Sequence, residues 1–176
     1  MNDRNVLRNL VLRRARRGEA EAAFRLVEGR VAWMEKTGIS QWPRRHYLSV
    51  YNRAYFQAAV RRAELWLLFE GVRPLACAVV LTRDERWRGR DEASAWYVHN
   101  LASLPGVPGA GAAFLSLLEK EARRAQAEYL RLDCKTGARK INAYYRKKGF
   151  VFTGYWGNGE YRGNLRQKKL ITGEER

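Results

Sequence analysis

The sequence contains few of the residues on which metal-binding and disulfide-rich proteins depend. Among 176 residues there are two cysteines and two histidines. With only these four residues of the types that usually hold zinc, we expect no metal site. A reduced protein is the simplest account of two cysteines, one of which, Cys77, lies in an apolar segment. Repeats, low-complexity tracts and linkers are also lacking, which favours one domain over residues 1–176.

Long hydrophobic runs are also missing. No apolar stretch approaches the roughly 18 residues that a membrane-spanning helix needs. The first 17 residues carry several arginines around only a short apolar patch, which is unlike a secretory signal. We therefore expect no membrane segment and a cytoplasmic location, as a monomer or a homodimer.

Acidic residues are scarce relative to basic ones. The chain has 34 Lys and Arg against 18 Asp and Glu, a net charge of +16. Such a charge attracts polyanions, including nucleic acid, acidic proteins and nucleotide cofactors. Between Cys134 and Gly149 there are six basic residues and no acidic one. These charges could serve binding, or they could simply keep the surface solvated.

What the sequence does have is a clear hydrophobic pattern, with 46% hydrophobic residues. Apolar or alternating segments predict strands at residues 9–14, 64–69, 75–81, 95–101, 129–133, 151–156 and 164–170. Apolar residues at three- and four-residue steps predict helices at 19–36, 48–63, 112–127 and 139–148. The charged segment 82–92 is expected to be an exposed loop. The resulting order is β-α-α-β-β-β-α-β-α-β-β.

The centre of the chain is a strand, a glycine-rich turn, a helix and a second strand. This βαβ unit should have a right-handed crossover and two parallel strands. The turn, residues 104–111, reads LPGVPGAG. Amides at the start of a helix have no partner within it and favour an anion, so this turn is a candidate phosphate site, although many such turns bind nothing. It lacks the Gly-Lys-Ser/Thr of a P-loop and the Gly-x-Gly-x-x-Gly of a dinucleotide-binding fold.

The turn resembles the acetyl-coenzyme A loop of the GNAT N-acetyltransferases, Arg/Gln-x-x-Gly-x-Gly/Ala at the start of a helix. A second match is the family's Tyr-x-x-x-Gly-Phe, which is YRKKGF at residues 145–150. Asp133-Cys134 and the segment 38–43, GISQWP, are also similar to the family. Two positions depart from it: Gly106 replaces the Arg/Gln, and Ala138 replaces an asparagine of the second helix.

The resemblance, over roughly residues 10–170, implies an α/β (α+β) fold. The expected fold is a mixed, mostly antiparallel twisted sheet of about seven strands with helices on both faces, the acyl-CoA N-acyltransferase fold. In this family the central parallel pair splays apart, and the pantetheine arm of the cofactor enters the gap.

The resemblance also implies a reaction, the transfer of an acetyl or other acyl group from acetyl-coenzyme A to an amine. The backbone of the turn would bind the diphosphate, strand ends would bind the pantetheine amides, and basic residues of the second helix would flank the cofactor. The cofactor-binding residues expected on this basis are Leu101, Ser103, Val107, Gly109, Ala110, Gly111, Ala112, Asn142, Tyr145 and Lys148.

Two residues are candidates for proton transfer. Tyr145 matches the family's general acid, which protonates the departing thiolate, by its spacing before Gly149. His99 lies on the strand beside the expected gap and could accept a proton from the amine. Each has a structural alternative, as a tyrosine packed under the next strand and as a buried histidine. A water chain could replace a side-chain base.

The acceptor amine is poorly specified by the sequence. The first two helices should line its pocket, and the candidate substrate-binding residues are Trp33, Gln41, Trp42 and Tyr55. Aromatic residues at helical spacing are also typical of a core. The alternative function is a catalytically weak or inactive basic module that binds RNA or an acidic partner. An acyltransferase that contacts nucleic acid or the ribosome would combine both.

Overall fold

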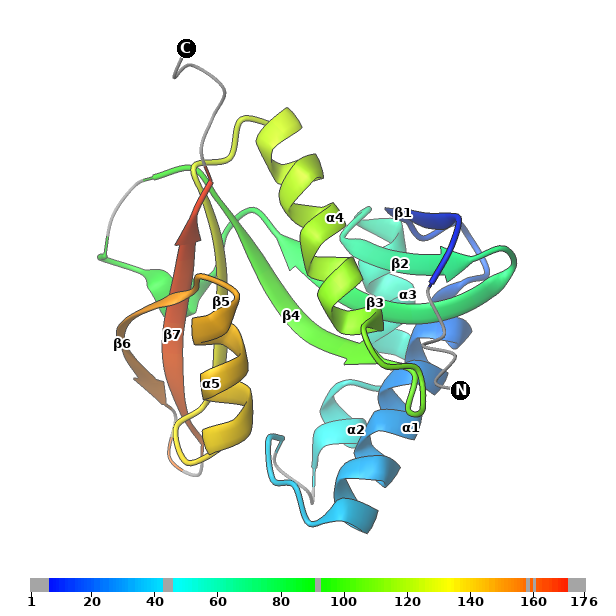
Figure 1. Cartoon of the computed structure of the whole chain (residues 1–176), viewed down its shortest axis with the longest axis horizontal. Helices are drawn as coiled ribbons and strands as arrows, with labels where there is room; N and C mark the ends of the chain where they lie inside the picture. The colour runs from blue at the N-terminus through cyan, green and yellow to red at the C-terminus, as the bar shows by residue number, and fades with distance from the viewer. Residues whose placement is uncertain (1–6, 43–45, 91–92, 158, 160, 171–176) are drawn as a thin grey trace, which may run out of the picture. The chain divides into compact units, whose positions relative to one another are not determined.

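The computed structural model describes residues 7–42, 46–90, 93–157, 159 and 161–170. All seven predicted strands are present (Figure 1). They are β1 (Leu10–Arg14), β2 (Leu65–Glu70), β3 (Arg73–Leu81), β4 (Ala95–Ser103), β5 (Tyr129–Lys135), β6 (Val151–Gly157) and β7 (Arg162–Lys169). The helices are α1 (Ala20–Thr37), α2 (Tyr47–Val50), α3 (Arg53–Arg61), α4 (Ala110–Arg124) and α5 (Arg139–Lys147), with a short 3₁₀ helix, η1 (Glu85–Trp87). The predicted tail, residues 172–176, lies outside the described residues.

The strands form one mixed sheet in the order β1-β2-β3-β4-β5-β7-β6. β4 and β5 are parallel, whereas β1 with β2, β2 with β3, β5 with β7 and β6 with β7 are antiparallel. This confirms the expected mixed, mostly antiparallel sheet with a central parallel pair. The parallel pair is the βαβ unit that the sequence predicted, with α4 as its crossover helix.

By its internal contacts the chain divides into two compact units. The first contains Met1–Trp33, Leu48–Val79 and Asn100–Leu118, and the second contains Met34–Tyr47, Val80–His99 and Glu119–Arg176. Because β4 and α4 contribute residues to both units, a single domain remains our proposal for the chain.

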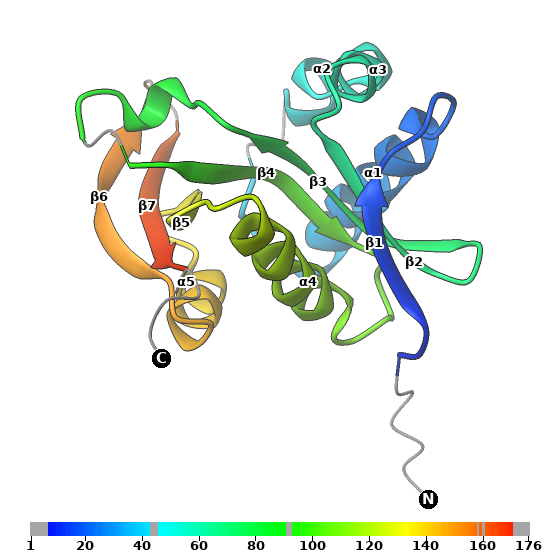
Figure 2. The ribbon, with the colours of Figure 1, turned by 90° about the horizontal axis from the view of Figure 1, so that it is seen from above.

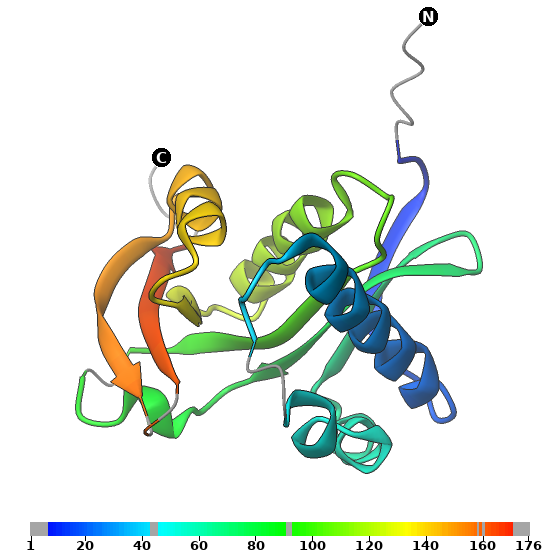
Figure 3. The same ribbon diagram turned by 90° about the horizontal axis from the view of Figure 1, so that it is seen from below.

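In the first unit, α3 and α4 lie on opposite faces of the sheet (Figures 2 and 3). α1 lies beside α3, since the rings of Phe24 and Phe56 meet edge to face with centroids 6.5 Å apart. Helices on both faces explain why β2 and β3 are almost continuously apolar rather than alternating. Buried helix residues here include Ala23, Leu26, Val27, Phe114, Leu115 and Leu118.

The single helix predicted at residues 48–63 is wrong, because the chain forms two helices there. α2 ends at Val50 and α3 begins at Arg53. Asn52 is the reason: its Oδ1 accepts a hydrogen bond from the Tyr55 N–H at 3.1 Å, and its Nδ2 donates to the Ser49 carbonyl at 3.0 Å. An asparagine that caps a new helix competes with continuation of the preceding one.

In the second unit, β5, β7 and β6 form an antiparallel sheet with α5 on one face (Figure 1). Arg131 of β5 is fully buried there. Its Nη1 donates to the Tyr97 hydroxyl at 3.0 Å, and its guanidinium lies 4.7 Å from the centre of the Trp87 ring. The core of this unit therefore contains a cation held by hydrogen bonds and aromatic faces.

The prediction of an exposed loop over residues 82–92 is wrong for its middle part, and residues 91–92 lie outside the described chain. Trp87, in η1, is only 4% exposed. It packs on Tyr97 with ring centroids 6.0 Å apart. The many charged residues of this segment predicted exposure, although Trp87 among them is buried. The burial of Trp87 places Asp84 and Arg86 next to β4.

Candidate functional site

The turn between β4 and α4, in the first unit, leaves a row of backbone donors without partners. The Leu104 N–H donates to the Leu75 carbonyl at 2.7 Å, which fixes the start of the turn to β3. The Val107 N–H donates to the Leu104 carbonyl at 3.3 Å, so this expected cofactor donor is already used. α4 begins at Ala110, and its first repeating bond comes from Ala113. Within the described chain, four amides accordingly lack a hydrogen-bond acceptor, those of Gly109, Ala110, Gly111 and Ala112.

Of two glycines in this turn, the backbone conformation requires one and not the other. Gly109 has φ +88°, which side chains rarely adopt, so the fold itself requires glycine there. Gly111 has no positive φ, and a Cβ added to it would lie 3.6 Å from Ser103 Oγ, an ordinary contact. The fold does not explain Gly111, whose lack of a side chain leaves the helix start open to a ligand.

Ser103, at the end of β4, is held by Arg30 of α1. Arg30 Nε donates to the Ser103 carbonyl at 2.9 Å, and Nη2 donates to that carbonyl and, at 2.7 Å, to Ser103 Oγ. Burial lowers the pKa of the Arg30 guanidinium, which nevertheless remains charged. The Arg30 guanidinium also lies 4.8 Å from the centre of the Trp33 ring. Ser103 was predicted to bind the cofactor and Trp33 to bind the acceptor amine. Both residues thus contact the guanidinium of Arg30.

β4 has an irregularity at Asn100, which the sequence analysis missed. Asn100 has φ +54° although it lies inside a strand. Its buried side chain accepts a hydrogen bond from the Tyr55 hydroxyl at 2.9 Å. Asparagine is among the few residues that tolerate this left-handed conformation. It redirects β4 immediately before Leu101, the expected pantetheine residue.

The parallel ladder in the second unit is short. It runs from Ala95↔Tyr129 to Val98↔Leu132, and no pair beyond these joins β4 to β5 in the described part of this unit. β5 continues to Lys135 on its other side, where Asp133 pairs with Leu165 of β7. The parallel ladder therefore ends at Val98↔Leu132, and His99 and Asp133 follow this last pair.

Tyr145 lies on α5 with its ring buried and its hydroxyl unbonded. The ring packs edge to face on Phe150, with centroids 5.7 Å apart, and on Tyr144. The hydroxyl makes no hydrogen bond to any described residue, and it is not among the fully enclosed polar atoms. Burial, and secondarily the charges of Cys134 and Asp133, raise the pKa of Tyr145 well above its ordinary value. The phenol therefore keeps its proton and has its bonding capacity free.

Asn142, expected to bind cofactor, is already engaged by the protein. Its Nδ2 donates to the Lys135 and Ala138 carbonyls at 2.9 and 3.0 Å. Its Oδ1 accepts from Asn164 at 2.6 Å and from Arg166 at 3.1 Å. These bonds join the turn before α5 to β7, so Asn142 positions Tyr145 three residues later. Lys148, at the end of α5, has its Nζ 5.8 Å from the Tyr144 ring centre.

His99 is the first member of a connected polar group in the second unit. Its Nε2 lies 2.9 Å from Asp84 Oδ2, an ion-pair distance, although the approach is not that of a hydrogen bond. Its Nδ1 lies 3.3 Å from Arg86 Nη1. Because Arg86 can only donate, Nδ1 of a neutral ring must be the acceptor, and the proton lies on Nε2.

The same group continues through Arg86 to β5 and β7. Arg86 Nη1 lies 2.5 Å from Asp133 Oδ1, and the Tyr161 hydroxyl donates to Asp133 Oδ2 at 2.6 Å. Burial alone would raise the pKa of Asp84, but His99 and Arg86 lower it by more, so it lies below the ordinary value. Burial and the Asp133 charge raise the pKa of Tyr161 far above its usual range. Asp84, His99, Arg86, Asp133 and Tyr161 thus form one connected polar group beside the end of the parallel ladder.

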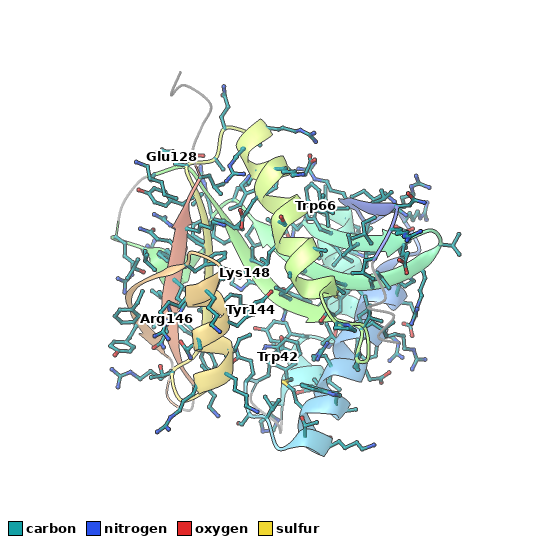
Figure 4. The ribbon with its side chains drawn as sticks, viewed as in Figure 1. Trp42, Trp66, Glu128, Tyr144, Arg146 and Lys148 are labelled. Carbon is teal, nitrogen blue, oxygen red and sulfur yellow. The ribbon has the colours of Figure 1, made fainter. Side chains whose placement is uncertain are left out.

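The four expected substrate residues fall in different units. Trp33 and Tyr55 belong to the first unit, where they contact Arg30 and Asn100. Gln41 and Trp42 belong to the second, and Figure 4 marks Trp42. Trp42 stacks on Tyr47 with centroids 4.3 Å apart and planes 4° from parallel. Oε1 of Gln41 is buried without a hydrogen-bond partner in the described residues.

Comparison with solved structures identifies the fold. A GNAT-family acetyltransferase from Listeria monocytogenes is similar over 92% of this chain and 95% of its own, with a TM-score of 0.76 and 20% identity. The chain has the GNAT fold. The PaiA N-acetyltransferase of Thermoplasma acidophilum, solved with coenzyme A, has a TM-score of 0.69 at 13% identity, covering 91% and 98% of the two chains. The ribosomal-protein-S18-alanine N-acetyltransferase of Escherichia coli has a TM-score of 0.65 at 13% identity, covering 95% and 98%. No protein-family model matches the sequence, and no curated protein is significantly similar.

Three residues that hold these GNAT-fold elements in place were missed in the sequence. Two of them could have been noticed as polar residues in apolar surroundings. Asn100 lies inside an apolar strand, and Arg30 lies on the buried face of a helix. Asp84 gives no local signal, because only the tertiary structure places it against His99. In the described part of this GNAT-fold chain no group of three or more His, Cys, Asp or Glu could hold a metal ion. Among the same residues, no helix has both the length and the apolar character to cross a bilayer.

Proposed function

We propose that this protein is an acetyl-coenzyme A-dependent N-acetyltransferase that transfers an acetyl group directly to a primary amine. The observation that carries the proposal is the open row of amides at the start of α4, in a fold whose relatives include a coenzyme A complex. Acetyl-coenzyme A would supply the acyl group as an activated thioester.

The chain's own groups fit the diphosphate of such a cofactor. Gly109, Ala110, Gly111 and Ala112 offer four N–H donors, and α4 adds the positive end of a helix of 15 residues. Gly111 allows close approach without a Cβ. Before the turn, the backbone of Leu101 would bind the pantetheine amides. Ser103 could add only its N–H, since Arg30 already occupies its carbonyl and its hydroxyl.

Tyr145 is our candidate for the proton donor to the departing thiolate. Its hydroxyl has no partner among the described residues, and its raised pKa keeps it protonated at any working pH. Asn142 and Phe150 hold the helix and the ring, so the donor is positioned before the reaction begins.

His99 is our candidate for the base that takes a proton from the acceptor amine. To accept it, Nδ1 must exchange Arg86 for the substrate. Arg86 keeps Asp133 as its partner when this contact breaks, and Asp84 then faces the newly charged ring. Asp84 is therefore our candidate for the residue that positions His99.

Replacement of His99 by glutamine tests this role. Glutamine can retain contacts with both Arg86 and Asp84 but cannot accept the proton, so we expect kcat/KM to fall by about 100-fold at neutral pH. A variant that keeps the rate would assign proton removal to water.

The proposed function itself is tested by the thermal stability of the protein with acetyl-coenzyme A. A ligand that binds only the folded state at about 100 times its Kd adds about 2.7 kcal/mol of stability, a rise of several degrees in Tm. Pantetheine, which lacks the diphosphate, should give little shift, and inorganic diphosphate controls for simple charge. The same samples are then assayed for thiol release with small amines, amino acids and peptides with free amino termini. Absence of any acetyl-coenzyme A shift would rule the proposal out, whereas a shift without transfer would favour the inactive binding module.

A further inference from the structure

More than half of the chain's net positive charge lies in one segment of the second unit. Residues 134–169 contain ten Lys and Arg and a single acidic residue, Glu160. Four cationic side chains of α5 are exposed and make no ion pair with any described residue, namely Arg139, Lys140, Arg146 and Lys147. Packing does not account for these charges, and no carboxylate within the described ranges forms an ion pair with them.

α5 presents part of this charge toward the outer strands. Arg139 and Arg146 are seven residues apart and therefore share one flank of the helix. Figure 4 shows Arg146 on the side of α5 toward β6, and Tyr144 and Lys148 on the opposite side. The flank that carries Arg139 and Arg146 thus borders the edge of the sheet.

β6, the outermost strand, carries two exposed aromatic side chains. Phe152 is 47% exposed and Tyr155 is 49% exposed, and their rings meet with centroids 5.0 Å apart. Residues three apart on a regular strand point to opposite faces. The register shifts between Phe152 and Gly154, which adds one residue and brings both rings to the same face.

Pairing with β7 shows that this is the face covered by α5. Phe152 is opposite Arg166, and Tyr155 is opposite Asn164. Both partners bond to Asn142 of α5, at 3.1 and 2.6 Å. Directly opposed residues point to the same face. The two exposed rings and the basic helix therefore share one face of the second unit.

Two arginines contact this surface, one at the Tyr155 ring and one at the carbonyl groups of the β6 edge. The Arg162 guanidinium lies 4.2 Å from the centre of the Tyr155 ring. Arg90 donates to the Thr153 and Tyr155 carbonyls, both at 3.1 Å. Since Arg90 occupies these edge carbonyls, β6 is poorly suited to pair with a strand of a second copy. Exposed rings beside unpaired arginines suit a polyanion that also has flat apolar faces.

We propose that a single-stranded nucleic acid docks on this surface, the β6 platform, formed by Phe152, Tyr155, Arg162, Arg139 and Arg146. Bases stack on the two rings, and the phosphates bind the arginines. Stacking on aromatic side chains together with a basic track is how proteins hold unpaired strands without reading their sequence. The inference is independent of the acetyl-transfer proposal, because none of the five residues is assigned there to cofactor or acceptor.

Fluorescence anisotropy with labelled oligouridine of about 20 nucleotides tests the platform. The intact protein should bind this strand more tightly than an RNA duplex of the same length. Phe152→Ala/Tyr155→Ala should raise the Kd for the single strand by about 10-fold or more and leave duplex binding nearly unchanged. Arg139→Glu/Arg146→Glu should weaken binding and reduce its salt dependence between roughly 50 and 200 mM.

The matched control is Arg17→Glu/Arg61→Glu, which makes the same charge change at exposed residues of the first unit. It should weaken binding far less than the α5 pair. Equal losses from both pairs, or no loss from the aromatic pair, would overturn the platform and leave only diffuse electrostatic attraction. Sedimentation of the intact protein as a dimer that Phe152→Ala/Tyr155→Ala dissociates would also overturn it, in favour of a second copy. Thermal shifts with acetyl-coenzyme A should be the same in the aromatic variant and the intact protein.

Discussion

Replacing Tyr145 with phenylalanine is expected to lower kcat by about 100-fold while acetyl-coenzyme A affinity stays within about twofold. The substitution removes one hydroxyl that bonds to no described residue, so packing on Phe150 and Tyr144 is retained. No buried partner is left unsatisfied, and Tm should not fall. A loss confined to kcat would mean that the hydroxyl acts in the transition state rather than in cofactor binding. Single-turnover and steady-state rates measure the loss in kcat, and calorimetry measures the Kd for acetyl-coenzyme A.

Tyr144→Phe is the matched control for this prediction. Tyr144 is the adjacent residue on α5, only half-buried, and burial raises its pKa less strongly. It should turn over at nearly the rate of the intact protein. If Tyr145→Phe also does so, Tyr145 is only a packing residue. The expected loss should not depend on pH near neutrality, because the raised pKa of Tyr145 keeps it protonated throughout.

Gly109→Asp is expected to weaken acetyl-coenzyme A binding by about 100-fold or more, equivalent to about 2.7 kcal/mol. The new carboxylate would stand beside the amides of Ala110 and Gly111, where it would neutralise the helix start and repel the diphosphate. Space is not the obstacle, since the nearest atom to an added Cβ would be Leu7 Cδ1 at 4.0 Å. Calorimetric titration with acetyl-coenzyme A measures the effect.

Two variants separate charge from strain in this experiment. Gly109→Asn has nearly the shape of aspartate and the same cost at φ +88°, and should bind within a few-fold of the intact protein. Gly106→Asp places the same charge at another positive-φ glycine of the turn, φ +81°, before the helix start. Similar losses for Asp and Asn at position 109 would contradict the anion site, because strain alone would then explain them.

Much of the fold was predictable because its hydrophobic periodicity is local. The unbroken apolar run of β2 and the apolar stripe of α4, with Phe114 and Leu118 both fully buried, predicted their own type and position. The boundaries were less exact. α4 begins at Ala110 rather than residue 112, because glycine and alanine give little periodic signal. Asn52 divided a predicted helix by a side-chain hydrogen bond that apolar spacing cannot detect.

The backbone amides of the candidate site could be predicted from the sequence. The side-chain contacts of the site could not, because they join residues that are distant in sequence. The glycine turn indicated free amides correctly, except for Val107, whose N–H bonds back to Leu104. The partners of Ser103 and His99 lie 73 and 13 residues away in sequence, at Arg30 and Arg86. Asn142 was predicted as a cofactor ligand, but its hydrogen bonds to Asn164 and Arg166 give it a positioning role.

The sequence by itself determined the order of strands and helices, the glycine-rich helix start, the Tyr145 spacing and the excess of basic charge. These features follow from neighbouring residues, whose side-chain period and backbone freedom act locally. Only the tertiary structure decided that Asn100 redirects β4, that Asp84 faces His99, and that a bulge brings Phe152 and Tyr155 to one face beside α5. Each of these depends on register or on contacts between segments distant in sequence, and a one-residue shift in a strand reverses the direction of every side chain that follows.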